Sequence, residues 1–220
     1  MLNGKRRRDP EAPVALAADR IQVDGAVVGR SRKLYLMLNK PRGLVTSAAD
    51  EKGRETIYSC LPPNLPWLSP VGRLDKASEG LLLLTNDSEW AARVLAPESH
   101  LEKTYHVQVC GQPGPDLLLS LTEGLGTEAG FLRVQSASIL RQGARNTWLE
   151  IILDEGKNRH IRRMLQALGI EVLRLLRVAI GTLRLGDLPK GGYREVTAEE
   201  KRALDLAMRQ GSAQTRARHR

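Results

Sequence analysis

Aromatic residues and cysteines are scarce in this chain of 220 residues: aromatics make up 4%, and Cys60 and Cys110 are the two cysteines. Two cysteines outside any CxxC pair are too few for a disulfide scaffold, so we expect buried thiols in a reducing compartment. Long apolar runs are also missing, since the leucines at 81–84 fall far short of the roughly 18 apolar residues of a membrane-spanning helix. No apolar segment follows the basic residues of 1–10, so we expect a cytoplasmic protein without a secretory signal.

Sequence motifs of several enzyme classes are absent. The chain has no GxxxxGK[ST] phosphate loop, no GxGxxG after a strand and no GxSxG nucleophile turn. Its four histidines form no HExxH pair and have no CxxC partners. We therefore expect no metal site.

The net charge is +9, and most of this surplus lies at the two ends of the chain, in segments that have no acidic residues. Eight basic residues lie within 5–8 and 209–220, whereas the chain from Asp9 to Met208 has 26 basic against 25 acidic residues. We predict two basic arms, with 209–220 disordered. Such arms either contact nucleic acid or increase solubility, and their composition does not distinguish the two.

One internal segment departs from this neutrality. Between Lys157 and Arg177 there are six basic residues and one acid, Glu171. Like charges this close together cost free energy unless an anionic partner neutralises them. The segment favours a surface that binds a polyanion, and the alternative is a solvated helix face.

Apolar patterning predicts strands and helices in irregular order. The expected strands cover 34–43, 80–85, 103–109, 131–140, 147–153, 172–185 and 193–196, with a hairpin around the Asp-Gly turn within 20–29. The expected helices cover 88–96 with Ser88 as N-cap, 115–124, 158–168 and 199–208, the last opened by a capping box at Thr197. This mixture predicts an α+β fold with a largely antiparallel sheet.

Three short motifs carry residues suited to chemistry. GRLDKASEG (72–80) places Asp75 just before a buried strand, which favours a rigid nucleophile or base over an ordinary turn aspartate. KTY (103–105) provides a tyrosine that either stacks on a nucleobase or fills the core. EGKNRHIRRML (155–165) gathers cations at the start of a helix, where anions bind.

Together with NKPRG (39–43), LEKTYHVQV and LRLGDLPKGGYREV, these motifs resemble the RsuA-type ribosomal RNA pseudouridine synthases from about Leu34 to Val196. The GRLD and EGKNRHIRRM blocks discriminate best. The resemblance implies a pseudouridine synthase fold, with a mixed, mostly antiparallel sheet, flanking helices and a central catalytic cleft. It also implies isomerisation of a uridine in RNA, with no cofactor or metal: the N1–C1′ bond breaks, and the base turns and rejoins through C5.

The resemblance implies a role for each site residue. Asp75 acts at the ribose, either by attacking C1′ or by taking the C2′ proton. Arg73 occupies the space of the flipped base, Tyr105 stacks on the uracil, and Arg162 pairs with Asp75 and lowers its pKa. His160, among arginines that disfavour its charged form, is expected on the helix surface or facing RNA. The residues expected to bind RNA are Arg73, Lys76, Lys103, Lys157, Arg159 and Arg163.

The resemblance also predicts the domain organisation. We expect a catalytic domain at 34–208, preceded by a basic leader at 1–33 that resembles the tail of an S4-like RNA-binding domain and is too short for a complete one. The expected partner is ribosomal RNA, with no membrane contact, and the expected state is a monomer. The alternative function is a non-catalytic RNA-binding factor of ribosome assembly on the same fold, which the presence of Asp75, Tyr105 and Arg162 disfavours.

Overall fold

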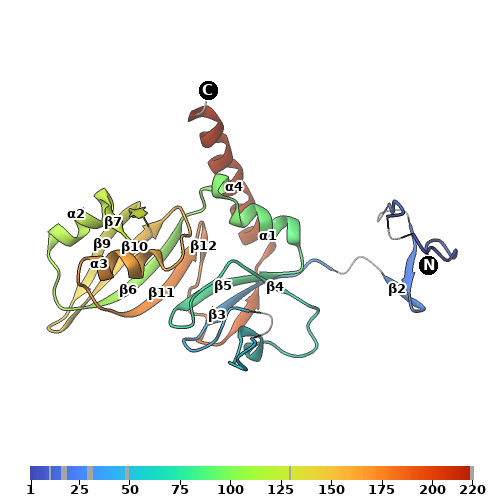
Figure 1. The fold of residues 1–220 in the computed structure, drawn as a ribbon, viewed down its shortest axis with the longest axis horizontal. Coiled ribbons are helices and arrows are strands. Elements are labelled where there is room, and N and C mark those ends of the chain that lie inside the picture. Colours follow the sequence, from blue (N-terminus) through green and yellow to red (C-terminus); the bar gives the residue numbers. More distant parts are fainter. Residues whose placement is uncertain (10, 16–18, 29–31, 48–49, 129, 219–220) are drawn as a thin grey trace. The chain divides into compact units, whose positions relative to one another are not determined.

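The computed structural model describes residues 1–9, 11–15, 19–28, 32–47, 50–128 and 130–218 (Figure 1). The chain divides into two compact units, Met1–Lys33 and Leu34–Arg220. The first contains an antiparallel hairpin of β1 (Ile21–Val23) and β2 (Ala26–Val28). Asp24 and Gly25 join these strands with positive φ angles of 50° and 82°, the geometry that favours Asp-Gly in tight hairpins, and the predicted hairpin is confirmed.

The second unit is built on one sheet with the strand order β13-β3-β5-β11-β6-β10-β9, in which β4 also pairs with β5 and β12 with β11. The strands are β3 (Tyr35–Lys40), β4 (Ser69–Val71), β5 (Glu79–Thr85), β6 (Lys103–Cys110), β9 (Ser136–Gln142), β10 (Asn146–Leu153), β11 (Val172–Ile180), β12 (Leu183–Arg184) and β13 (Tyr193–Glu195). Among the described residues, every pairing in this sheet is antiparallel except β5 with β11, so the mixed, mostly antiparallel sheet is confirmed.

The parallel pairing of β5 with β11 joins the two halves of the sheet. Gly80 lies on β5 directly opposite Arg177 of β11. A Cβ atom at Gly80 would lie 2.2 Å from the Arg177 carbonyl oxygen, and its φ of +104° is a conformation that other residues rarely adopt. Glycine at this position therefore allows the close approach of the two strands.

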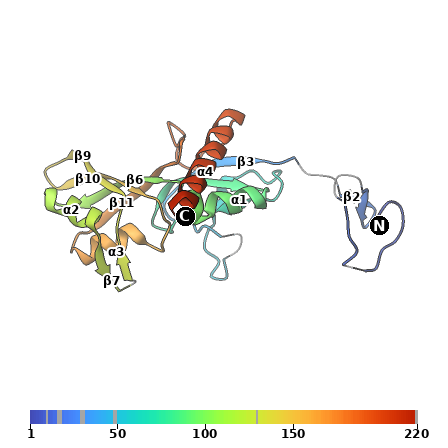
Figure 2. The same cartoon turned by 90° about the horizontal axis from the view of Figure 1, so that it is seen from above.

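Three apolar clusters of the described residues pack against these halves. In one half, α2 (Pro115–Glu123) and α3 (His160–Ala167) pack with β6, β10 and β11, and a small hairpin, β7 (Leu125–Thr127) with β8 (Gly130–Leu132), completes this cluster. Figure 2 shows α3 and β7 on the same side of the strands. In the other half, the buried leucines of β5 contribute to apolar clusters on both faces of the sheet. The strand expected over 131–140 is interrupted, because β8 and β9 are separate strands.

The other helices correct two expectations. The N-cap of α1 (Ser88–Leu95) is Asp87, whose side chain accepts a hydrogen bond from the Trp90 N–H, so the assignment of Ser88 was wrong by one residue. The capping box of α4 (Ala198–Arg218) is confirmed: Thr197 and Glu200 each accept the other's backbone N–H.

The disordered tail expected at 209–220 was wrong for 209–218, which continue α4 away from the sheet (Figure 1); residues 219 and 220 lie outside the described part of the chain. A Cβ at Gly211 would lie 2.2 Å from the Ser99 carbonyl oxygen. This close approach packs the helix against 97–99 at a point where the sequence has already become basic.

Exposure of the cysteines differs from the expectation. Cys60 is half-buried, and Cys110 is exposed because it ends β6 at the rim of the sheet, so the expectation of a buried thiol was wrong for Cys110. Within the described ranges, no helix combines the length and the apolar character needed to cross a membrane.

Candidate active site

A cavity of about 510 Å³ opens where the two halves of the sheet meet. It is lined by the loop between β4 and β5, the start of β6, the loop before α3, α3 itself and β11. The cations on its wall are Arg73, Lys103, Lys157, Arg159, Arg162 and Arg177. Asp75 is the acidic residue in the same lining. One carboxylate among six cations gives a site that attracts an anionic ligand.

Asp75 lies in a loop that buried side chains hold in place. Lys40 of β3 has no exposed surface, and its ammonium donates to the carbonyl oxygens of Pro41, Asp75 and Ser78 at 3.1, 3.1 and 2.9 Å. The Thr46 hydroxyl donates to the Leu74 carbonyl at 2.8 Å. Burial lowers the pKa of Lys40 to about 8, while the nearby Asp75 opposes this shift. The backbone on both sides of the Asp75 carboxylate is therefore fixed, as a reacting group requires.

The nearest cation to the Asp75 carboxylate comes from Arg159, not from Arg162. Arg159 Nη1 lies 3.8 Å from Asp75 Oδ2. Arg162 instead donates to the Ala77 carbonyl at 3.1 Å and to the Val172 carbonyl at 3.5 Å. The expected pairing of Arg162 with Asp75 is therefore not a direct salt bridge among the described residues, although the Asp75 charge still acts on the Arg162 guanidinium. Arg162 fastens the Asp75 loop to β11, and burial lowers its pKa.

Tyr105 is half-buried on β6, contacts the apolar clusters of both halves and lines the cavity together with Asp75. Lys103, two residues earlier on the same strand, also lines the cavity. Burial lowers the pKa of Lys103, and the neighbouring Arg177 cation lowers it further. The expected tyrosine and one expected cation thus share the cavity with the carboxylate.

The cations predicted to bind RNA are divided by the structure. Arg73, Lys103, Lys157 and Arg159 line the cavity. Lys76 and Arg163 are outside its lining: Lys76 is exposed, and Arg163 donates to the Asn158 side chain at 3.2 Å.

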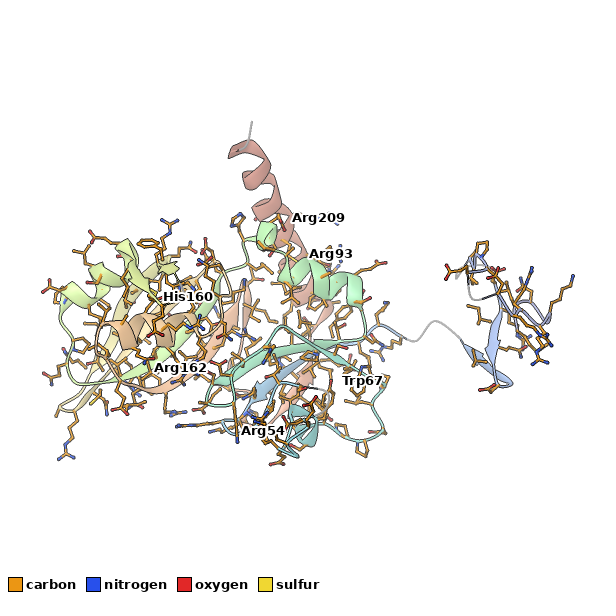
Figure 3. The ribbon with its side chains drawn as sticks, in the orientation of Figure 1. Arg54, Trp67, Arg93, His160, Arg162 and Arg209 are labelled. Carbon is orange, nitrogen blue, oxygen red and sulfur yellow. The ribbon has the colours of Figure 1, made fainter. Side chains whose placement is uncertain are left out.

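His160 is buried, which contradicts the expected surface position. It begins α3, and Figure 3 shows it with Arg162 on this helix; its exposed fraction is 3%. Burial lowers its pKa, while the Glu155 carboxylate, 3.7 Å away, opposes the shift. The helical period could have revealed this position, because His160 shares a face with Ile161, Met164 and Leu165.

Arg177, which the sequence places in the basic segment 157–177 without a role in the site, lines the cavity. It is 6% exposed, its Nε donates to the Leu81 carbonyl at 2.8 Å, and its Nη2 is buried without a hydrogen-bond partner in the described part of the chain. The Ser78 hydroxyl, also in the cavity wall, is unpartnered in the same sense. The sequence held a signal for this position, because alternate residues of a strand share a face and Arg177 lies two residues after the buried Leu175.

The RNA pseudouridylate synthase family model matches residues 34–167. The chain belongs to this family. It is 37% identical to the ribosomal large subunit pseudouridine synthase B of Bacillus subtilis (strain 168), over 85% of this chain and 78% of that protein. It is 38% identical to an uncharacterized RNA pseudouridine synthase of Aquifex aeolicus (strain VF5), over 94% and 84% of the two chains.

Solved structures agree with this assignment. A pseudouridylate synthase crystal structure superposes with a TM-score of 0.70 and 31% identity, over 93% of this chain and 87% of that one. The predicted RsuA-type family and pseudouridine synthase fold are confirmed, and the protein is an isomerase of RNA uridines. The comparisons favour the enzyme over the non-catalytic alternative. In the described residues, no three His, Cys, Asp or Glu side chains gather as metal ligands would.

Proposed function

We propose that this enzyme converts a specific uridine of ribosomal RNA to pseudouridine, with Asp75 acting at the ribose of a flipped-out nucleotide. The observation that carries the proposal is one carboxylate among six cations, beside Tyr105, in a cavity of about 510 Å³. The similarity to a relative named for the large ribosomal subunit supports ribosomal RNA as the substrate class.

The reaction exchanges one glycosidic bond for another. The N1–C1′ bond breaks, the C5–C1′ bond forms, C5 loses its proton and N1 gains one, so no oxidant or group donor is needed. In one route the Asp75 carboxylate bonds to C1′ as N1 leaves, and C5 then displaces it. In the other, Asp75 removes the C2′ proton as the N1–C1′ bond breaks and returns it after C5 has attacked C1′. Both routes need an ionised carboxylate against the ribose.

The surrounding side chains have separate roles in this proposal. Tyr105 stacks on the detached uracil and keeps it in place while it turns, and Arg73 fills the space that the base leaves in the RNA. Arg159, 3.8 Å from Asp75, stabilises the carboxylate. The buried donors Arg177 Nη2 and Ser78 Oγ have no partner among the described residues, which suits hydrogen bonds to the bound nucleotide.

Phosphate contacts come from cations at the edge of this cavity. Lys103, Lys157 and Arg159 line it, and we extend the phosphate-binding surface to Lys76 and Arg163 beyond its lining. We further propose that the enzyme acts as a monomer in the cytoplasm, where ribosomal RNA is modified.

Pseudouridine mapping on unmodified transcripts of both ribosomal subunits tests the proposal. We expect one strong carbodiimide-dependent stop in primer extension with the wild type and none with Asp75→Asn, a loss of at least about 10⁴-fold if the carboxylate is the essential group. Asp187→Asn, an exposed carboxylate outside the cavity, is the matched control and should retain the stop. Tight RNA binding without any stop, on transcripts and on assembly intermediates, would support the non-catalytic alternative.

A further inference from the structure

A second cavity of about 600 Å³ adjoins the catalytic one. The two share Pro97 and Lys157 in their linings, so a nucleotide in the second cavity would be a neighbour of one in the first. Neither the catalytic residues nor the chemistry described above uses this space.

The most unusual residue in the wall of this cavity is Phe131, the one phenylalanine of the chain. It lies on β8 and is 61% exposed, although an aromatic ring is among the most favourable side chains to bury. A Cβ at Gly124 would lie 2.5 Å from the ring atom Cζ, and the φ of Gly124 is +93°. The ring therefore contacts bare backbone on one side and leaves aromatic surface exposed beside the catalytic cavity.

Polar groups in the rest of the wall suit a nucleobase better than a phosphate. Glu123, Asp154 and Glu155 line it together with His100 and the cations Lys157 and Arg133. Glu155 is already paired with Lys157 at 2.9 Å. Carboxylates repel phosphate and accept hydrogen bonds from amino groups, as Asp and Glu do from the N4 amino group of cytosine.

We propose that this cavity binds the base directly 5′ or 3′ of the target uridine, and that it selects a base with an exocyclic amino group over uracil. The inference rests on the proposed function, because it places the target uridine in the neighbouring cavity. Phe131 stacks on the flanking base, and Glu123 or Asp154 accepts its amino hydrogens. This surface makes part of the choice of target nucleotide, beyond what phosphate contacts provide.

The test uses the full chain and stem-loop RNAs that contain the mapped uridine, with each of the four bases placed in turn on its 5′ and 3′ sides. The variants are Phe131→Ala, Phe131→Tyr and the double variant Glu123→Gln with Asp154→Asn. Leu119→Ala is the matched control, because Leu119 is 56% exposed on α2 and lines neither cavity.

At one flanking position we expect the wild type to prefer an amino-bearing base over uracil. Phe131→Ala should lower kcat/KM by about 5- to 150-fold, the value of one stacked base, through KM and with kcat unchanged at saturation. Phe131→Tyr should retain stacking and behave as the wild type. The double variant should lose most of the preference against uracil while its kcat is retained.

Two results would overturn the inference while leaving the proposed function intact. One is a wild type that makes pseudouridine with less than twofold dependence on both flanking bases, and the other is a Phe131→Ala enzyme that matches Leu119→Ala. If the wild type modifies no RNA, the proposed function fails, and RNA affinity alone then tests whether the second cavity binds a base. Weaker binding by Phe131→Ala than by Leu119→Ala then supports a base-binding site, and equal binding overturns it.

Discussion

Replacing Gly80 by alanine should push β5 and β11 apart where they join the two halves of the sheet, and should destabilise the protein. The new Cβ would lie 2.2 Å from the Arg177 carbonyl oxygen and 2.8 Å from its nitrogen, whereas real Cβ atoms are not found within 3.0 Å. The oxygen must therefore retreat by at least about 0.8 Å, across the one parallel pairing of the sheet. Both atoms belong to backbone, so a change of side-chain rotamer offers no relief.

The expected cost has two parts. Forced overlap in a packed interior costs about 1–3 kcal/mol, and a non-glycine residue at this positive φ adds about 1–2 kcal/mol. The sum is about 2–5 kcal/mol, a large share of the 5–15 kcal/mol that stabilises a typical domain. For a domain of this size, we expect the melting temperature to fall by about 10 °C. Activity should fall as well, because Arg177 faces the catalytic cavity from the displaced strand.

Thermal unfolding followed by circular dichroism, together with urea denaturation, measures this effect. Gly126→Ala is the matched control, because a Cβ at Gly126 meets nothing within 4 Å and its φ lies outside the positive range. That variant should remain within about 0.5 kcal/mol of the wild type. If Gly80→Ala melted within 2 °C of Gly126→Ala, the close approach of β5 and β11 would not be a structural requirement, and this reasoning would be refuted.

Two further predictions concern buried groups beside the site. Lys40→Met leaves three carbonyl oxygens without their donor, so we expect this variant to lose about 3–5 kcal/mol of unfolding free energy and most of its activity. Lys52 is exposed, so Lys52→Met should lose neither. Equal urea midpoints for the two variants would contradict this prediction. Burial lowers the pKa of His160 below its ordinary 6.5, so the unfolded chain binds more protons below that pH and stability should fall as the pH drops from 7 to 5. The slope of melting temperature against pH should flatten in His160→Gln and persist in His106→Gln, and equal slopes in both would exclude His160 as its source.

The local part of the site was predictable from sequence because motif residues close in sequence keep their relation in the fold. Asp75 and Arg73 share one loop, Lys103 and Tyr105 share one strand, and all four reach the cavity as expected. The helix that carries Arg162 was expected from apolar period, and the buried strand β5 from its run of leucines. Short-range periodicity and turn residues contain this information.

Sequence alone determined most of the element types and the family, and it placed Asp75 just before a buried strand. Only the tertiary structure decided which cations reach that carboxylate. Arg162 donates a hydrogen bond to a carbonyl 85 residues away in the sequence, and Arg177 donates to one 96 residues away. The orientations of these two side chains therefore depend on how β11 packs against β5. The contacts of Arg162 and Arg177 join distant segments whose approach is set by packing of the whole core, which no local pattern contains.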